Sequence, residues 1–112
     1  DAETAAIGWL GGAMGVPVRG AVPRPRPPRL VIVERTGGAV SSGIDRAQLA
    51  VQCWAPSPAE AAALAVEAEE ALSAMEDEPW AALCEVVSRY RFPPPDGGGA
   101  RYQLTVEAHV YA

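Results

Sequence analysis

The chain has 112 residues with nine arginines, no lysine and 14 acidic residues, and its formal net charge is −5. This length indicates one domain spanning residues 1–112, too short for a barrel enzyme or a two-domain cofactor fold. The acidic balance argues against a nucleic-acid-binding domain, which would carry a basic face.

The first quarter of the chain contains a helix-like segment followed by a proline-rich segment. Residues 3–14 predict a short helix, because Ile7, Leu10 and Met14 follow one another at helical spacing. Residues 16–29 (VPVRGAVPRPRPPR) contain five prolines and four arginines. Proline fixes φ and removes a backbone donor, so we expect an extended connector here, with at most a short edge strand near its start.

A pair of strands follows the connector. Residues 30–36 (LVIVERT) are rich in β-branched side chains and predict a strand that ends at Gly37. Residues 36–45 (TGGAVSSGID) have the composition of a flexible hairpin loop, and 46–55 (RAQLAVQCWA) predict the return strand. Along that strand two sets of side chains alternate between the faces: Leu49, Val51 and Cys53 on one, and Gln48, Ala50, Gln52 and Trp54 on the other.

The clearest helix is predicted over residues 58–75. Ser57 is a favourable N-cap, Pro58 suits the first helical position, and Glu60 completes a capping box. One stripe is apolar and should face a sheet: Ala61, Leu64, Ala65, Ala68, Leu72 and Met75.

Two further strands are predicted beyond this helix. Residues 83–92 (LCEVVSRYRF) and 101–111 (RYQLTVEAHVY) flank a loop, 93–100, that is rich in proline and glycine. In the last strand, apolar and polar side chains alternate over its whole length. The element order α-β-β-α-β-β predicts an α+β two-layer domain, with a mostly antiparallel four-stranded sheet and two helices.

No set of residues has the spacing of a catalytic, metal or cofactor site, so we expect no enzyme and no cofactor. His109 is the only histidine and faces outward on a strand suited to a sheet edge, without a second ligand or a nucleophile nearby in sequence. Cys53 and Cys84 lie in apolar strand patterns, typical of buried reduced thiols. No apolar run approaches the roughly 20 residues of a membrane span, and no signal peptide is evident, so we expect a cytosolic origin and no membrane association.

The negative charge is concentrated in one segment. Residues 55–88 carry a charge of −8, whereas residues 1–54 carry +2 and residues 89–112 carry +1. This segment is either the solvated face of one helix or a negative surface that meets a basic partner or repels DNA.

The combined pattern resembles the tail terminator proteins of long-tailed phages that infect high-GC bacteria. The resemblance rests on residues 23–38 (PRPRPPRLVIVERTGG), the strand RAQLAVQCWA, the Ala- and Glu-rich helix, and a Pro/Asp/Gly loop before RYQLTVEAHV. It covers nearly the whole chain in order. The high arginine, alanine, glycine and proline content is also typical of GC-rich codons. The loop 93–100 matches the family's usual Pro-Asp-Pro run only in part.

This resemblance implies a virion protein that forms a ring, expected to be hexameric, on the head-proximal end of the tail tube. The ring would end tube polymerisation and join the tail to head-completion proteins, after assembly in the host cytoplasm. DNA would pass through its lumen without sequence-specific binding. A head–tail connector or stopper of the phage neck, or a small host binding domain, remain alternatives.

Two groups of residues are expected at surfaces of such a ring. The first would contact neighbouring subunits or rings: Arg19, Arg24, Arg26, Arg29, Asp96, Gly97, Gly98 and Arg101. The second would supply negative charge to the lumen or to subunit contacts: Glu60, Glu67, Glu69, Glu70, Glu76, Asp77 and Glu78.

Overall fold

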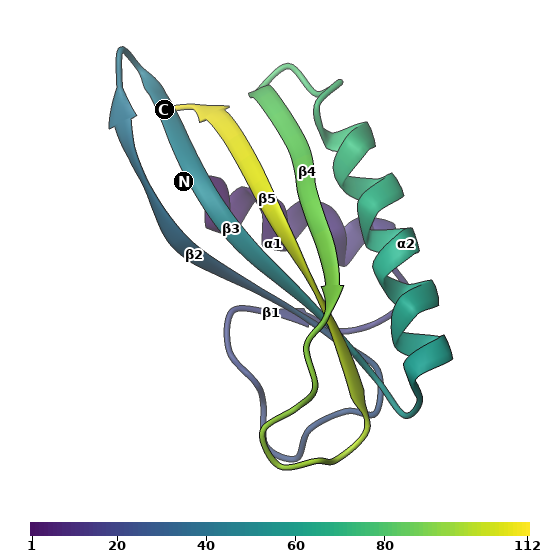
Figure 1. Ribbon diagram of the computed structural model, residues 1–112. Coiled ribbons are helices and arrows are strands. Elements are labelled where there is room, and N and C mark those ends of the chain that lie inside the picture. The colour runs from purple at the N-terminus through teal and green to yellow at the C-terminus, as the bar shows by residue number, and fades with distance from the viewer.

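The protein is an α+β domain in which two helices cover one face of a five-stranded sheet (Figure 1). The computed structural model describes all 112 residues. In chain order the elements are α1 (Ala2–Ala13), β1 (Val18–Arg19), β2 (Leu30–Ser41), β3 (Ile44–Ala55), α2 (Pro58–Met75), β4 (Ala81–Arg91) and β5 (Ala100–Tyr111).

The sheet has the strand order β1-β2-β3-β5-β4. The predicted α+β class and the mostly antiparallel pairing are confirmed, but the sheet has five strands instead of four, because the short edge strand expected in the connector also pairs with it. The residues Val18 and Arg19 form β1, which pairs in parallel with β2, while every other pairing is antiparallel. β5 lies between β3 and β4, so His109 stands on a central strand and not at an edge.

The predicted loop over residues 36–45 is also wrong, because β2 and β3 continue through almost all of it. Only Ser42 and Gly43 form the turn, and both have a positive φ, as a two-residue hairpin turn requires. The register shifts at a bulge between Arg35 and Gly37, and the strand continues through the two glycines. At Gly38 a Cβ atom would lie 1.9 Å from the Arg46 carbonyl oxygen, so only glycine fits there.

The helix α2 follows its prediction closely. The Ser57 hydroxyl accepts a hydrogen bond from the Glu60 amide at 3.3 Å, which caps the first turn. All six residues of the predicted stripe are buried. Five of them pack within the main core, which includes Leu49, Val51, Leu104 and Val106, and Ala61 packs in a small separate cluster with Ala55 and Ala100.

The predicted apolar stripe of α1 is confirmed in part. Leu10 and Met14 are buried, but Ile7 is only half-buried, and Ala2 and Ala6 complete the buried face. The small alanine side chains let α1 lie close behind the strands, across which it runs in Figure 1. The Trp9 indole N–H donates to the Ala71 carbonyl oxygen at 2.6 Å and joins the two helices.

A buried carboxylate holds the start of α1 against the sheet. Asp45 on β3 accepts two hydrogen bonds from the Arg35 guanidinium, at 2.8 and 2.9 Å, and one from the Ala2 amide at 2.9 Å. Its exposed fraction is 2%. These bonds, first those from Arg35 and then that from Ala2, lower the pKa of the Asp45 carboxyl to about 2.

Asp45→Asn should lower the free energy of unfolding by about 2 kcal/mol at neutral pH, because Arg35 and the helix terminus lose their charged acceptor. Since the folded pKa is depressed from 3.8, this stabilisation is present above pH 3.8 and is lost as the pH falls toward 2. Urea unfolding of both proteins across this range measures the difference, which should shrink in acid. Asp96→Asn, at an exposed carboxylate, is the control and should change stability much less. Equal stability of Asp45→Asn and the wild type at neutral pH would contradict the assignment.

Candidate assembly surfaces

Two loops meet at the end of the sheet that lies opposite the β2–β3 turn (Figure 1). One is the proline-rich connector between β1 and β2, and the other joins β4 to β5. Arg26 of the first loop donates to the Asp96 carboxylate at 3.2 Å and to the Gly98 carbonyl oxygen at 2.9 Å. Asp96 in turn accepts from the Gly98 amide at 2.9 Å. That amide, together with Arg26, lowers the pKa of the Asp96 carboxyl.

Both loops are held against the ring of Trp54, near the end of β3. The guanidinium carbons of Arg26 and Arg101 lie 4.6 and 4.8 Å from the centroid of its ring. Arg101 also lies 4.2 Å from the Phe92 ring. On the same face of the sheet, Leu30 and Ile32 form a small second core with Trp54. Cation–π contacts and apolar packing therefore fix both loops to the sheet.

Arg101 is almost completely buried, with an exposed fraction of 7%. Its guanidinium donates to the carbonyl oxygens of Phe92 and Pro93, at 2.7 and 3.0 Å, and forms no ion pair with a carboxylate. Burial lowers the pKa of this guanidinium. The carbonyl oxygens and aromatic rings replace the water molecules that would hydrate the guanidinium group of an exposed arginine.

The residues predicted to contact neighbours therefore divide into two groups. Arg26, Asp96, Gly98 and Arg101 come together in the loop cluster around Trp54, where their polar groups bond within the chain. The others lie at the surface: Arg19, Arg24, Arg29 and Gly97 are exposed, although Arg29 forms an ion pair with Glu60. Sequence reasoning did not include Trp54 or Phe92 in the cluster, because both lie in apolar strand patterns.

The predicted acidic residues divide in a similar way. Glu60 pairs with Arg29, and Glu69 pairs with Arg89 of β4. Glu76 follows α2 and accepts a hydrogen bond from the Cys84 amide at 2.9 Å. The remaining four form no ion pair within the chain: Glu67, Glu70, Asp77 and Glu78.

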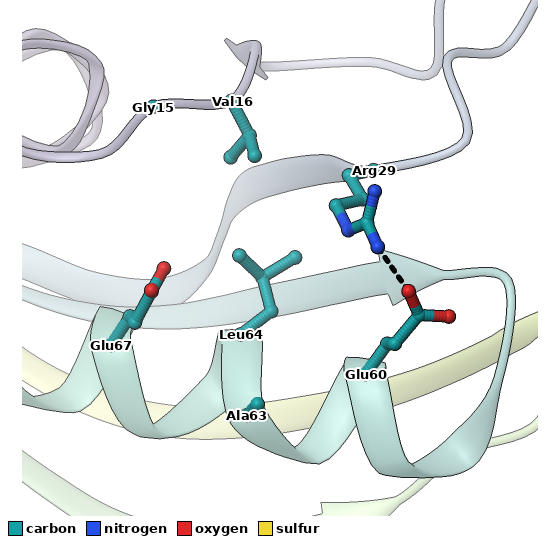
Figure 2. Close-up of a pocket in the computed structure, with 7 residues that line it drawn as sticks. All are labelled: Gly15, Val16, Arg29, Glu60, Ala63, Leu64 and Glu67. Carbon is teal, nitrogen blue, oxygen red and sulfur yellow. Dashed lines mark hydrogen bonds and ion pairs between the residues drawn. The ribbon is translucent and has the colours of Figure 1, made fainter.

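A hollow of about 370 Å³ separates α2 from the segment that follows α1. In Figure 2, Glu60, Leu64 and Glu67 project from α2 towards Gly15 and Val16, with Arg29 above Glu60. Glu67 also borders a second hollow next to Glu70. Both hollows are shallow, and acidic side chains of α2 line them together with apolar side chains.

The face of the sheet opposite the helices carries a row of polar side chains. The Gln103 amide donates to the Tyr90 hydroxyl at 2.6 Å, and the Gln52 amide donates to the Gln103 carbonyl oxygen at 3.2 Å. The Trp54 indole donates to Gln52 at 3.3 Å and completes the row. Further along the same face, His109 lies 3.2 Å from Glu107. Outside the loop cluster, this face therefore carries many polar side chains, and both helices lie on the other face.

The side chains that commonly act as nucleophiles or metal ligands do not form a cluster. Cys53 and Cys84 are free and buried, and burial raises the pKa of both thiols to about 12. No three His, Cys, Asp or Glu side chains gather in a group that could hold a metal ion. Neither helix has the length and apolar character needed to cross a bilayer.

The chain matches no protein-family model and no curated protein.

Trp54→Ala should release both loops from the sheet, because the two guanidinium groups lose the ring beneath them. We expect a loss of about 3 kcal/mol in the free energy of unfolding and faster amide hydrogen exchange in residues 96–99, which follow the three prolines of the loop. Exchange in α2 should change little. Trp80→Ala, at a tryptophan that is 36% exposed, is the matched control and should leave the loop amides unaffected. Unchanged exchange in the loop of Trp54→Ala would contradict the anchoring role.

Proposed function

We propose that the chain is a virion structural protein, a tail terminator that forms a ring on the head-proximal end of a phage tail tube. The ring ends tube polymerisation and presents a surface to head-completion proteins. Copies of this chain, the tail tube protein and head-completion proteins are its partners, and the host cytoplasm is where it assembles. Six copies per ring follow from the family resemblance. The proposal assigns no catalytic activity and no cofactor.

The observation that carries the proposal is that both edges of the sheet lack a full partner strand. β4 forms one edge without a partner strand, and at the other edge β1 covers only two residues of the twelve-residue β2. Open edges of this kind pair readily with further strands, so a stable protein covers them or uses them in an assembly. A subunit that closes into a ring removes both edges at once.

The distribution of charge also supports a ring around DNA. Four acidic residues on or just after α2 remain free of ion pairs, and the helix-free face of the sheet carries neutral amides and further carboxylates beside the arginine Arg46. A surface of this composition does not attract phosphates, so a duplex could move past it without binding. The contribution of Glu60, Glu69 and Glu76 to this field is smaller, because each is engaged within the chain.

Tail length is the property that tests the proposal. In a phage whose gene for this chain is deleted, tails should grow beyond their normal length and should not join heads. Electron microscopy of the lysate measures both, and expression of the wild-type chain in the host is the control that restores normal tails. Tails of normal length, together with heads that lose their DNA, would reject the terminator function and indicate a stopper of the neck.

A second measurement addresses the chain directly. Purified protein added to polymerising tail tube protein should shorten the tubes in proportion to its concentration and should be visible at one end. Tubes of unchanged length would contradict the proposal.

A further inference from the structure

The two open edges of the sheet are each closed at one end by a glutamate from the helical layer. On β2, the Glu3 carboxylate of α1 accepts a hydrogen bond from the Arg35 amide at 3.2 Å. On β4, the Glu76 carboxylate accepts from the Cys84 amide at 2.9 Å. These bonds satisfy the edge where it lies next to a helix. Beyond them, the backbone of each strand has no partner on its outer side.

Each edge has an uncovered segment beyond its glutamate. The β2 edge segment is Thr36–Ser41, and the β4 edge segment is Glu85–Arg91. Nearly all their residues are exposed or half-buried, and neither segment contains the proline or lysine that commonly blocks an edge. Each segment has a bulge at its start or within it, but both remain extended and paired with their inner neighbours.

The two most exposed large apolar side chains lie on these segments, one on each. Val40 is 61% exposed and Val87 is 58% exposed, the highest values among the large apolar residues. Tyr90 lies in the β4 edge segment, and Phe92 follows it directly. An exposed valine on an open edge lowers solubility and invites strand pairing, so its presence needs a reason outside the single chain.

We propose that the β4 edge segment of one copy pairs with the β2 edge segment of the next, as antiparallel strands of one continuous sheet. This inference rests on the proposed ring and identifies the surface through which its subunits join. The directions fit, because β2 and β4 run opposite ways in the sheet (Figure 1). A neighbour placed this way continues the antiparallel pattern and keeps all helices on one face.

The exposed valines of the segments distinguish unlike edges from like ones. The β2 edge segment has no charged side chain, whereas the β4 edge segment carries Glu85, Arg89 and Arg91, and Arg89 pairs with Glu69 of α2. Pairing β4 with a second β4 would leave Val40 uncovered. Pairing β2 with a second β2 would leave Val87 and Tyr90 uncovered. A contact between different edges is heterologous, and successive copies therefore form a closed ring or a filament.

Cross-linking through introduced cysteines tests which edges meet. Val40→Cys and Val87→Cys are made singly and together, and a bismaleimide spacer joins thiols that face one another. The double variant should give a ladder of covalent oligomers that ends at the ring size. A mixture of the two single variants should give dimers only, since each copy then has one reactive edge. The wild type is the control, because Cys53 and Cys84 are buried.

Several results would overturn the proposal. Dimers from Val87→Cys alone would show β4 pairing with β4, and dimers from Val40→Cys alone would show β2 pairing with β2. A double variant without a ladder, or a wild-type chain that stays monomeric up to millimolar concentration, would reject the contact altogether.

Charge at the same positions gives an independent measurement. Val87→Lys should weaken self-association at least roughly tenfold, because a lysine at a strand edge resists desolvation. Val66→Lys, at an exposed valine that is on α2 and not on either edge segment, is the matched control and should associate like the wild type. Adding Val40→Glu to Val87→Lys should restore part of the association. Circular dichroism verifies that each variant is folded, and equal association of Val87→Lys and Val66→Lys would refute the proposed edge contact.

Failure of this inference differs visibly from failure of the proposed function. If Val87→Lys still forms rings and shortens tail tubes, the terminator function stands and the edge contact is wrong. If the cross-linked ladder forms but wild-type rings do not affect tube length, the edge contact stands and the terminator function is wrong.

Discussion

The organisation of the molecule depends on a mismatch of length between its helices and its strands. Strands of eleven or twelve residues extend for roughly 40 Å, at about 3.3 Å per residue, and the longest dimension of the protein is 42 Å. The helices α1 and α2, at about 1.5 Å per residue, span only ~18 and ~27 Å. Two helices of this size cover the middle of one face and leave the ends, the edges and the opposite face to other contacts.

The loops and several charged residues cover or bond the parts of the sheet that the helices leave free. At one end of the sheet, Arg26 and Arg101 hold two loops over Trp54 and bury what the helices do not reach. In the helical layer, Asp45 attaches the start of α1, while Glu3 and Glu76 close the nearest stretches of the two edges. Several acidic side chains near the surface are therefore structural, because they bond to the backbone or to arginines of the same chain.

Much of the fold could be predicted from local signals. The alternation in β5, the cap at Ser57 and the apolar stripe of α2 each need only a few neighbouring residues to be recognised. The course of residues 36–45 could not be predicted, because the composition TGGAVSSGID is typical of a loop and only pairing with β3 keeps it extended. For the candidate surfaces, residue types indicated arginines and acids at contacts. Whether a given arginine meets a neighbour or Trp54 depends on loops that are distant in sequence.

By itself, the sequence determined a single α+β domain, the position of its long helix, the alternation of its strands and the concentration of negative charge in one segment. These properties follow from side-chain periodicity and capping, which act over a few residues. Only the tertiary structure decided that β5 lies between β3 and β4, that Asp45 is buried under α1, and that two edge segments remain uncovered. Strand order and burial depend on which distant segments pack together, because hydrogen bonds between strands and apolar contacts form regardless of separation along the chain.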